Sequence, residues 1–251
     1  IRCIYLRMSR MTETGTERIA KRLAKAGLCS RREGERWIYN GRVSVDGTVL
    51  RTPAITVSAH STIKVDGKLI PPTTEPRLWR YHKPCGLLTT HRDPQGRATV
   101  FDRLPTELPR TISVGRLDIN SEGLLLLTNN GDLARHLELP STGLTRRYRA
   151  RIRGVIDGSV LETLKKGITV NGARYGPIFA TVDRQLRNNA WLSLSITEGK
   201  NREVRRVLNH LGFDVSRLIR VGYGPFQLGT LAPQKLAEIP SKRIKKFTVR
   251  P

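Results

Sequence analysis

The sequence has few cysteines, no cluster of metal ligands and no long apolar run. Its three cysteines, Cys3, Cys29 and Cys85, are far apart and form no Cys-x-x-Cys pair, and the five histidines show no ligand spacing. This pattern argues against a disulfide framework or a zinc site and is typical of a reducing compartment. No apolar stretch approaches the roughly 18 residues of a membrane-spanning helix, and the opening IRCIYLRMSRM lacks the apolar core of a signal peptide. We therefore expect a cytoplasmic protein without a metal or membrane contact, with translation beginning at Met8 or Met11.

Motifs of several common chemistries are also absent. The sequence contains no Gly-x-Ser-x-Gly, no His-Glu-x-x-His, no Walker pattern and no Gly-x-Gly-x-x-Gly after a predicted strand. It therefore predicts neither a nucleotide cofactor nor a Ser/His pair.

Negative charge is scarce in this composition. The chain has 21 acidic residues against 45 lysines and arginines, which gives a net charge of +24 over 251 residues and a pI near 11.1. Such an excess indicates a polyanionic partner, and nucleic acid is a better candidate than an anionic membrane surface. The hydrophobic fraction of 38% is enough for a globular fold and argues against wholesale disorder.

The pattern along the chain predicts two folded parts joined by a linker. We expect a polar tail at 1–16, a small α/β module at 17–68, a Pro/Thr-rich linker at 69–77, a larger domain at 78–240 and a basic tail at 241–251. Short strands alternate with a few helices in the larger domain, so the predicted fold class is α+β.

The small module combines two helices with a hairpin. The first helix stops at Gly27, a Ser30–Glu33 capping box opens the second, and Asp46-Gly47 turns the hairpin. The helices carry a basic face formed by Arg18, Lys21, Arg22, Lys25, Arg31, Arg32 and Arg36. Such a face is either solvated or bound to phosphates, and its one-signed charge favours phosphates. The stretch KRLAKAGLCSRREGERWIYNGRVSVDG resembles the alpha-L RNA-binding module, named after a small-subunit ribosomal protein.

A single carboxylate, Asp118, stands between an arginine and a run of leucines in GRLDINSEGLLLLTNNG. TISVGRLD predicts a strand, INSEG a turn, and LLLLT a strand buried on both faces, followed by a helix capped by Asn130 or Asp132. The loop bearing Asp118 would then be held rigidly between two core strands. Spacing alone leaves two readings open: an Asp that only bonds its own turn, or a nucleophile that an arginine keeps ionised.

The segment TRRYRARIRG predicts a strand with an arginine ladder. Alternation gives one face to Tyr148, Ala150 and Ile152 and the other to Arg147, Arg149, Arg151 and Arg153. An arginine ladder is typical of a strand that faces a phosphate backbone. Tyr148, on the apolar face, is either part of the core or a ring that stacks on a base.

A basic helix is expected after the strand WLSLSI. We predict that Asn201 caps this helix and that its apolar stripe begins at Val204. On the helical wheel Arg205 flanks the stripe, whereas Arg202 and Arg206 point outward. Arg205 can then reach a site that its neighbours cannot, unless all three form a solvated basic face.

Four segments, in this order, resemble the motifs of one enzyme family. They are YHKPCGLLTTHRDPQGRATVFDRLP, GRLDINSEGLLLLTNNGDLA, TRRYRARIRG and EGKNREVRRVLNHLGFDVSRLIRVGYGPFQLGTL. From about residue 17 to 240 the chain resembles the ribosomal-RNA pseudouridine synthases of the RsuA type, and EGKNREVRR is closer to the RluB-like, large-subunit branch. Cys85 and the form NREVRR depart from some relatives, and the second departure bears on which rRNA is modified.

The resemblance implies isomerisation of a uridine in ribosomal RNA, large-subunit rRNA by branch. The N-glycosidic bond breaks, the uracil turns over and a C–C bond forms to the same sugar carbon, so no cofactor is needed. The resemblance assigns Asp118 to start glycosidic cleavage, Arg205 to pair with this carboxylate and Tyr148 to stack on the flipped base. It further implies that Arg116 and Lys200 contact the RNA or support the site residues, and that Arg97 helps to displace the target base. We also expect RNA contacts for Arg147, as part of the arginine ladder, and for Arg202. The implied fold is a mixed, mostly antiparallel sheet with the Asp in a central cleft.

The expected partner is ribosomal RNA or a ribosome assembly intermediate, bound by a monomer. The alternative is a ribosome-binding or assembly factor with an inactive second domain. The presence of Asp118, Tyr148 and Arg205 together speaks against this alternative.

Overall fold

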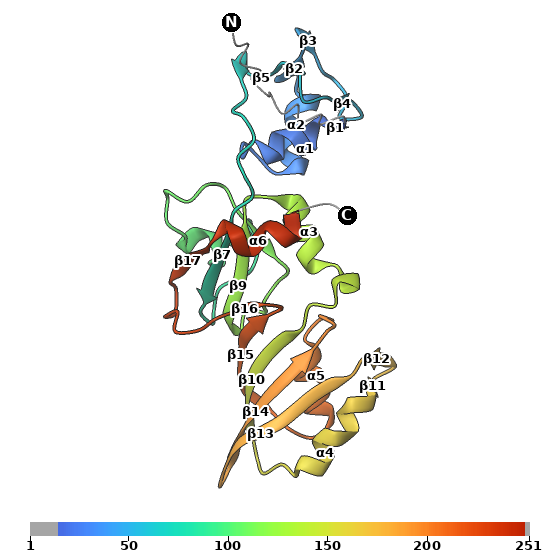
Figure 1. Ribbon diagram of the computed structural model, residues 1–251, viewed down its shortest axis with the longest axis vertical. Helices are drawn as coiled ribbons and strands as arrows, with labels where there is room; N and C mark the ends of the chain where they lie inside the picture. The colour runs from blue at the N-terminus through green and yellow to red at the C-terminus, as the bar shows by residue number, and fades with distance from the viewer. Residues whose placement is uncertain (1–14, 249–251) are drawn as a thin grey trace, which may run out of the picture. The chain divides into compact units, whose positions relative to one another are not determined.

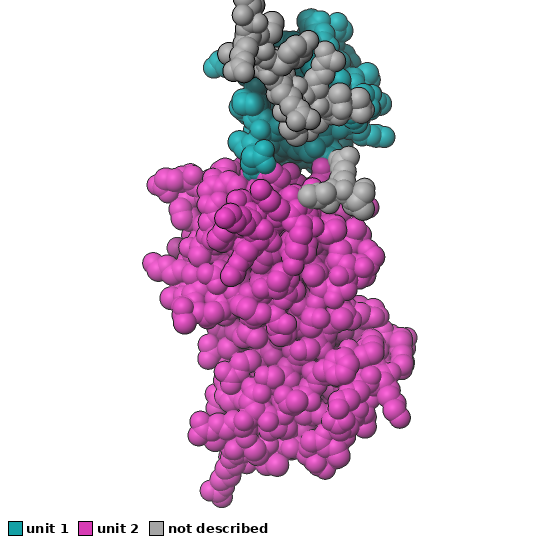
Figure 2. All heavy atoms as spheres, viewed as in Figure 1, with its two compact units in different colours: residues 1–75 teal, residues 76–251 magenta. Residues whose placement is uncertain are grey.

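The computed structural model describes residues 15–248, so the expectations for Cys3, the start codon and most of the N-terminal tail lie outside the described residues. The chain divides into two compact units, residues 1–75 and 76–251 (Figure 2). The division falls within the Pro/Thr-rich segment of the sequence. Across residues 15–248, every helix is too short or too polar to cross a lipid bilayer.

The first unit packs two helices on small sheets (Figure 1). Its elements are β1 (Glu17–Arg18), α1 (Ile19–Lys25), α2 (Arg31–Tyr39), β2 (Val43–Val45), β3 (Thr48–Val49), β4 (Thr56–Val57), β5 (Ile63–Val65) and β6 (Lys68–Leu69). The strands form a four-stranded sheet, β3-β2-β5-β6, and the pair β1-β4. Ile19, Leu23, Ile38, Val43 and Ile63 are buried between helices and sheet.

Local signals in this unit form mostly as expected. The Ser30 hydroxyl accepts a hydrogen bond from the Glu33 N–H at 3.1 Å and so caps α2. The Glu33 carboxylate does not complete the capping box, because it accepts a hydrogen bond from Trp37 Nε1 at 3.1 Å instead. Asp46 and Gly47 have φ angles of 49° and 86°, as a tight hairpin turn requires.

The second unit is built on a nine-stranded sheet (Figure 1). Its strands are β7 (Leu78–Lys83), β8 (Ile112–Val114), β9 (Glu122–Thr128), β10 (Arg146–Arg153), β13 (Ile178–Leu186), β14 (Asn189–Ile196), β15 (Val215–Tyr223), β16 (Phe226–Gln227) and β17 (Leu236–Ile239). The helices are α3 (Gly131–Glu138), α4 (Gly158–Thr163), α5 (Glu203–His210) and α6 (Ser241–Thr248), with short 3₁₀ turns at Phe101–Arg103, Pro140–Thr142 and Leu164–Lys166. A hairpin, β11 (Ile168–Val170) and β12 (Ala173–Tyr175), lies apart from the main sheet.

The sheet has two halves that meet at one parallel pair. The strand order is β13-β14-β10-β15-β9-β7-β17, with β16 beside β15 and β8 beside β9. β9 and β15 run parallel, and the remaining pairs of this sheet are antiparallel, which confirms the mixed, mostly antiparallel prediction. Gly123 in this pair has φ +103°, and a Cβ there would lie 2.4 Å from the Arg220 carbonyl oxygen. The junction therefore requires glycine.

Separate groups of buried side chains fill the two halves. Leu192, Leu194 and Ile196 of β14 pack with α4 and α5 in one half. In the other half the four leucines of β9 divide between its two faces, Leu124 and Leu126 on one and Leu125 and Leu127 on the other. All four leucines are fully buried, which confirms the prediction of a strand covered on both faces.

Two predictions for this unit were wrong in extent. The strand before Asp118 ends at Val114, because Gly115, with φ +65°, turns the chain out of the sheet. Most of the expected basic tail is the helix α6, whose Ile244 is buried and whose Phe247 ring lies 5.7 Å from the Phe226 ring. Apolar residues three apart give this basic segment a face that packs on the unit.

Candidate active site

Asp118 lies in a short loop between two strands of the central sheet. The loop leaves β8 at Gly115, whose N–H donates to Glu138 Oε1 at 2.7 Å. It closes where the Ser121 N–H donates to the Asp118 carbonyl at 3.0 Å. The buried β9 follows at once, so the backbone around Asp118 is fixed at both ends, while its side chain stays 29% exposed.

The ammonium group of a buried lysine donates hydrogen bonds to the backbone of the same loop. The Lys83 side chain is fully buried, and its Nζ donates to the carbonyls of Pro84, Asp118 and Ser121 at 3.0, 3.0 and 2.8 Å. Burial lowers the pKa of this ammonium to about 8. Lys83 was not among the residues predicted for the site, although a lysine that ends an otherwise core-forming strand was a usable signal.

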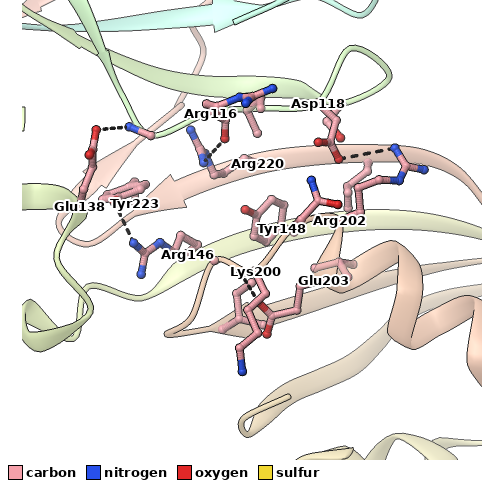
Figure 3. Close-up of a pocket in the computed structure, with 18 residues that line it drawn as sticks. Arg116, Asp118, Glu138, Arg146, Tyr148, Lys200, Arg202, Glu203, Arg220 and Tyr223 are labelled. Carbon is pink, nitrogen blue, oxygen red and sulfur yellow. Dashed lines mark hydrogen bonds and ion pairs between the residues drawn. The ribbon is translucent and has the colours of Figure 1, made fainter. Parts of the chain in front are cut away.

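Asp118 lines a cavity of about 420 Å³ between the two halves of the sheet (Figure 3). Arg116, Leu117 and Ser121 line it from one half. Ile196, Leu218 and the loop before α5 line it from the other half. Tyr148 of β10 also lines the cavity and packs against the cores of both halves, so its ring bridges the junction.

The cation paired with Asp118 is Arg202, which corrects the prediction for Arg205. Arg202 Nη1 lies 3.7 Å from Asp118 Oδ2 (Figure 3). Arg205 instead donates to the carbonyls of Val215 at 2.6 Å and Asn120 at 2.8 Å. Burial lowers the pKa of the Arg205 guanidinium, and the charge of Asp118 acts in the opposite direction.

The physical reason is the start of the helix. Asn201 does not cap α5; Arg202 precedes it with φ 53°, in the left-handed region. The Arg202 side chain therefore does not follow the helical wheel and is free to turn towards Asp118. The Glu203 carboxylate accepts the Lys200 N–H at 2.9 Å and supports this first turn.

Two buried arginines of the cavity wall were also missed. Arg146 Nη2 donates to the Tyr223 hydroxyl at 2.9 Å, and that hydroxyl donates to the Leu137 carbonyl at 2.9 Å. Arg220 Nε donates to the Leu124 carbonyl at 2.8 Å. These bonds tie β10 and β15 to the half that carries Asp118.

The remaining predicted RNA contacts of this unit are spread out. Arg116, exposed, and Lys200 line the cavity, but Lys200 Nζ is paired with Glu198 at 2.8 Å. Arg147 donates to the Gly224 carbonyl at 2.7 Å and does not line the cavity. Arg97 pairs with Asp93 at 2.8 Å in a loop outside the cavity lining, and this arginine lowers the pKa of Asp93 to about 2.

The basic residues of the first unit lie on α1, α2 and the end of β1. Arg18, Arg31, Arg32 and Arg36 are exposed, whereas Lys21, Arg22 and Lys25 are half-buried. Glu17 pairs with Lys25 at 2.9 Å and with Arg22 at 3.9 Å. Part of the expected phosphate-binding face is therefore neutralised within the unit.

Comparison with known proteins identifies the family of each unit. Residues 77–210 match the family described as RNA pseudouridylate synthase, and residues 17–63 match the S4 domain. The chain therefore belongs to the RNA pseudouridylate synthase family, and it is an RNA pseudouridine synthase.

Individual relatives are similar over most of the chain. The uncharacterized RNA pseudouridine synthase of Rickettsia felis is 47% identical over 230 residues, covering 92% of this chain and 100% of that protein. The ribosomal large subunit pseudouridine synthase B of Yersinia pestis is 43% identical over 221 residues, covering 84% and 69%. A crystal structure of a pseudouridylate synthase, 22% identical, covers 92% of this chain and 99% of its own with a TM-score of 0.64, which shows a shared fold.

Proposed function

We propose that this enzyme converts a specific uridine of large-subunit ribosomal RNA to pseudouridine, starting from the Asp118 carboxylate. The relatives named for the large ribosomal subunit, such as that of Yersinia pestis at 43% identity, support the choice of RNA. The observation that carries the chemistry is that the Asp118 carboxylate and the Tyr148 ring line the same cavity at the junction of the sheet.

The reaction rearranges bonds without adding or removing atoms. The bond from uracil N1 to the sugar C1′ breaks, the uracil turns over within the site, and its C5 bonds to the same C1′. The hydrogen of C5 leaves as a proton and N1 gains one, so no oxidant, reductant or group donor is required. Asp118, held by its loop, acts on the nucleoside to start cleavage of the glycosidic bond.

The other side chains bind and orient the nucleotide. A uridine must leave its helix to enter a cavity of this size, and a ring such as Tyr148 can stack on the flipped base. Arg202 complements the carboxylate at 3.7 Å, while Arg205 supports the loop through the Asn120 carbonyl. The S4 domain supplies further RNA contacts through the exposed arginines of α2.

The proposal extends to the state of enzyme and substrate. The enzyme acts in the cytoplasm as a monomer, on rRNA or on a ribosome assembly intermediate. Because a basic S4 domain precedes the synthase unit, the enzyme can contact its substrate at more than one place, as binding of a folded rRNA requires and binding of an isolated nucleoside does not.

Asp118→Asn tests the chemistry with little change of shape. Large-subunit and small-subunit rRNA, each carrying tritium at uracil C5, are incubated separately with wild type and variant, and the reaction releases the tritium to water. Chemical probing then locates the pseudouridine. The wild type should release tritium, and Asp118→Asn should release none above background while binding the RNA as before. Equal release by both would refute the role of Asp118, and pseudouridine only in small-subunit rRNA would refute the choice of RNA.

A further inference from the structure

The arginine ladder of β10 faces away from the active site. Arg146 and Tyr148 line the cavity, and Ala150 and Ile152 continue their face into the core, where they pack with residues of α4 and α5. Arg149, Arg151 and Arg153 alternate with these residues and so lie on the opposite face of the sheet. The cavity therefore does not explain the ladder.

Neighbouring strands extend the ladder into a basic surface. We define the arginine face by Trp191 together with Arg149, Arg151, Arg153, Arg184 and Arg217. One row across four strands has the order Arg184, Trp191, Arg151, Arg217, each residue paired with the next in the sheet register. Arg149 lies over the Trp191 ring, 4.9 Å from its centroid.

The positive charge of the arginine face is only partly compensated. Arg217 pairs with Glu122, and Arg149 with Asp183 at 3.3 Å. Across residues 15–248, Arg151 and Arg184 form no ion pair, and Arg151 Nε is buried without a hydrogen-bond partner. Glu122 balances the charge of Arg217, whereas Arg151, directly opposite Arg217 in the sheet, has no counter-ion within the described residues and is left to bind an anion from outside.

The face also suits a nucleic-acid strand in shape. Arginines at every second residue of a strand lie about 7 Å apart, close to the spacing of successive phosphates along one nucleic-acid strand. Small polar residues, Thr181, Ser193 and Ser195, separate the arginines from Phe179, whose side chain is 58% exposed. An exposed ring on the same face as the arginines can stack on a base, which favours a nucleic acid over an acidic protein surface.

We propose that the arginine face is a second RNA-binding surface, which holds the phosphate backbone of an rRNA segment other than the one carrying the target uridine. This inference rests on the proposed function, since it takes the same rRNA as the partner. A folded rRNA would then contact the synthase unit on both faces of its sheet.

The test compares two double variants with equal loss of charge. Arg151→Gln with Arg184→Gln changes the arginine face, and Lys165→Gln with Lys166→Gln changes the helix-covered side, where Leu164 is anchored in the core. The probe is large-subunit rRNA transcribed in vitro, and its binding is measured over a series of salt concentrations. The face variant should bind on the order of 10-fold more weakly, with a salt slope smaller by about 2, because each phosphate contact contributes about 1.

The melting temperature of each variant and its release of tritium from the rRNA are measured as well. Without RNA, the face variant should melt no lower than wild type, because the two substitutions break no ion pair among the described residues. Unchanged affinity, or equal weakening by the lysine control, would overturn the proposal. Binding is measured independently of tritium release. A wild type that binds the rRNA without modifying it would refute the proposed function, and the comparison of the two variants in binding would still test the arginine face.

Discussion

Replacing Lys83 with methionine should change how the stability of the synthase unit depends on pH. Methionine keeps the length of the side chain but removes the ammonium beneath the Asp118 loop. Burial lowers the pKa of Lys83 from 10.5 to about 8. Between these values the unfolded chain binds the proton and the folded chain does not, so the free energy of unfolding rises with pH.

The magnitude follows from the shift. One unit of pKa corresponds to about 1.4 kcal/mol, so the whole effect is about 3 kcal/mol, of which about 2 kcal/mol is gained between pH 7 and 9.5. Below pH 8 both states hold the proton and the contribution is flat. The wild-type free energy of unfolding should therefore rise relative to that of Lys83→Met as the pH increases above 8.

Urea unfolding followed by tryptophan fluorescence measures this difference. Trp79 and Trp191 lie in the synthase unit and Trp37 in the other, so a Trp37→Phe background isolates the relevant transition. Lys235→Met, which removes an exposed lysine of the same unit, should follow the wild-type pH dependence. A difference between wild type and Lys83→Met that stays flat or falls with pH would show that the carbonyls, not burial, dominate the pKa of Lys83, and the reasoning would be wrong.

Two further substitutions test the junction and the cavity. Gly123→Ala should prevent stable folding, because its Cβ would lie 2.4 Å from the Arg220 carbonyl oxygen. Gly143 also has a positive φ, but a Cβ there would have no atom within 4 Å, so Gly143→Ala should lower the free energy of unfolding by only about 1–2 kcal/mol. Equal losses of stability in thermal melting would contradict the clash at Gly123. Arg202→Gln should lower the rate of rRNA turnover without lowering the melting temperature. Arg205→Gln should lower both, because Arg205 donates to two backbone carbonyls. If Arg205→Gln lowered turnover alone and Arg202→Gln lowered the melting temperature, Arg205 would again be assigned as the partner of the Asp118 carboxylate.

Local patterns in the sequence predicted the framework of the site. Four successive leucines predicted a strand buried on both faces, and Asn130 was a predicted cap whose Oδ1 accepts the N–H groups of Asp132 and Leu133. Both depend on neighbours within a few residues. The alternation along β10 was likewise correct, with Ala150 and Ile152 buried.

The missed residues act across long sequence separations. Lys83 bonds a carbonyl 35 residues away, and Arg220 one that is 96 residues away. No spacing pattern indicates which carbonyls a fold brings together. The error at Arg202 had a different cause, since the helical wheel assumed a regular helix from Asn201, and a single left-handed residue redirected the side chain.

The position of the site follows from the way the sheet is joined. β9 and β15 pair over only two residue pairs, Ile219 with Glu122 and Arg220 with Gly123. Asp118 stands four residues before the first of these on one half, whereas Tyr148 and Arg202 belong to the other half. Their separation is therefore set by the junction and by the bonds that cross it, from Arg220 to Leu124 and from Tyr223 to Leu137. Gly123, which does not line the cavity, thus fixes the distance between the carboxylate and the ring, because the backbones of the two halves meet at that residue.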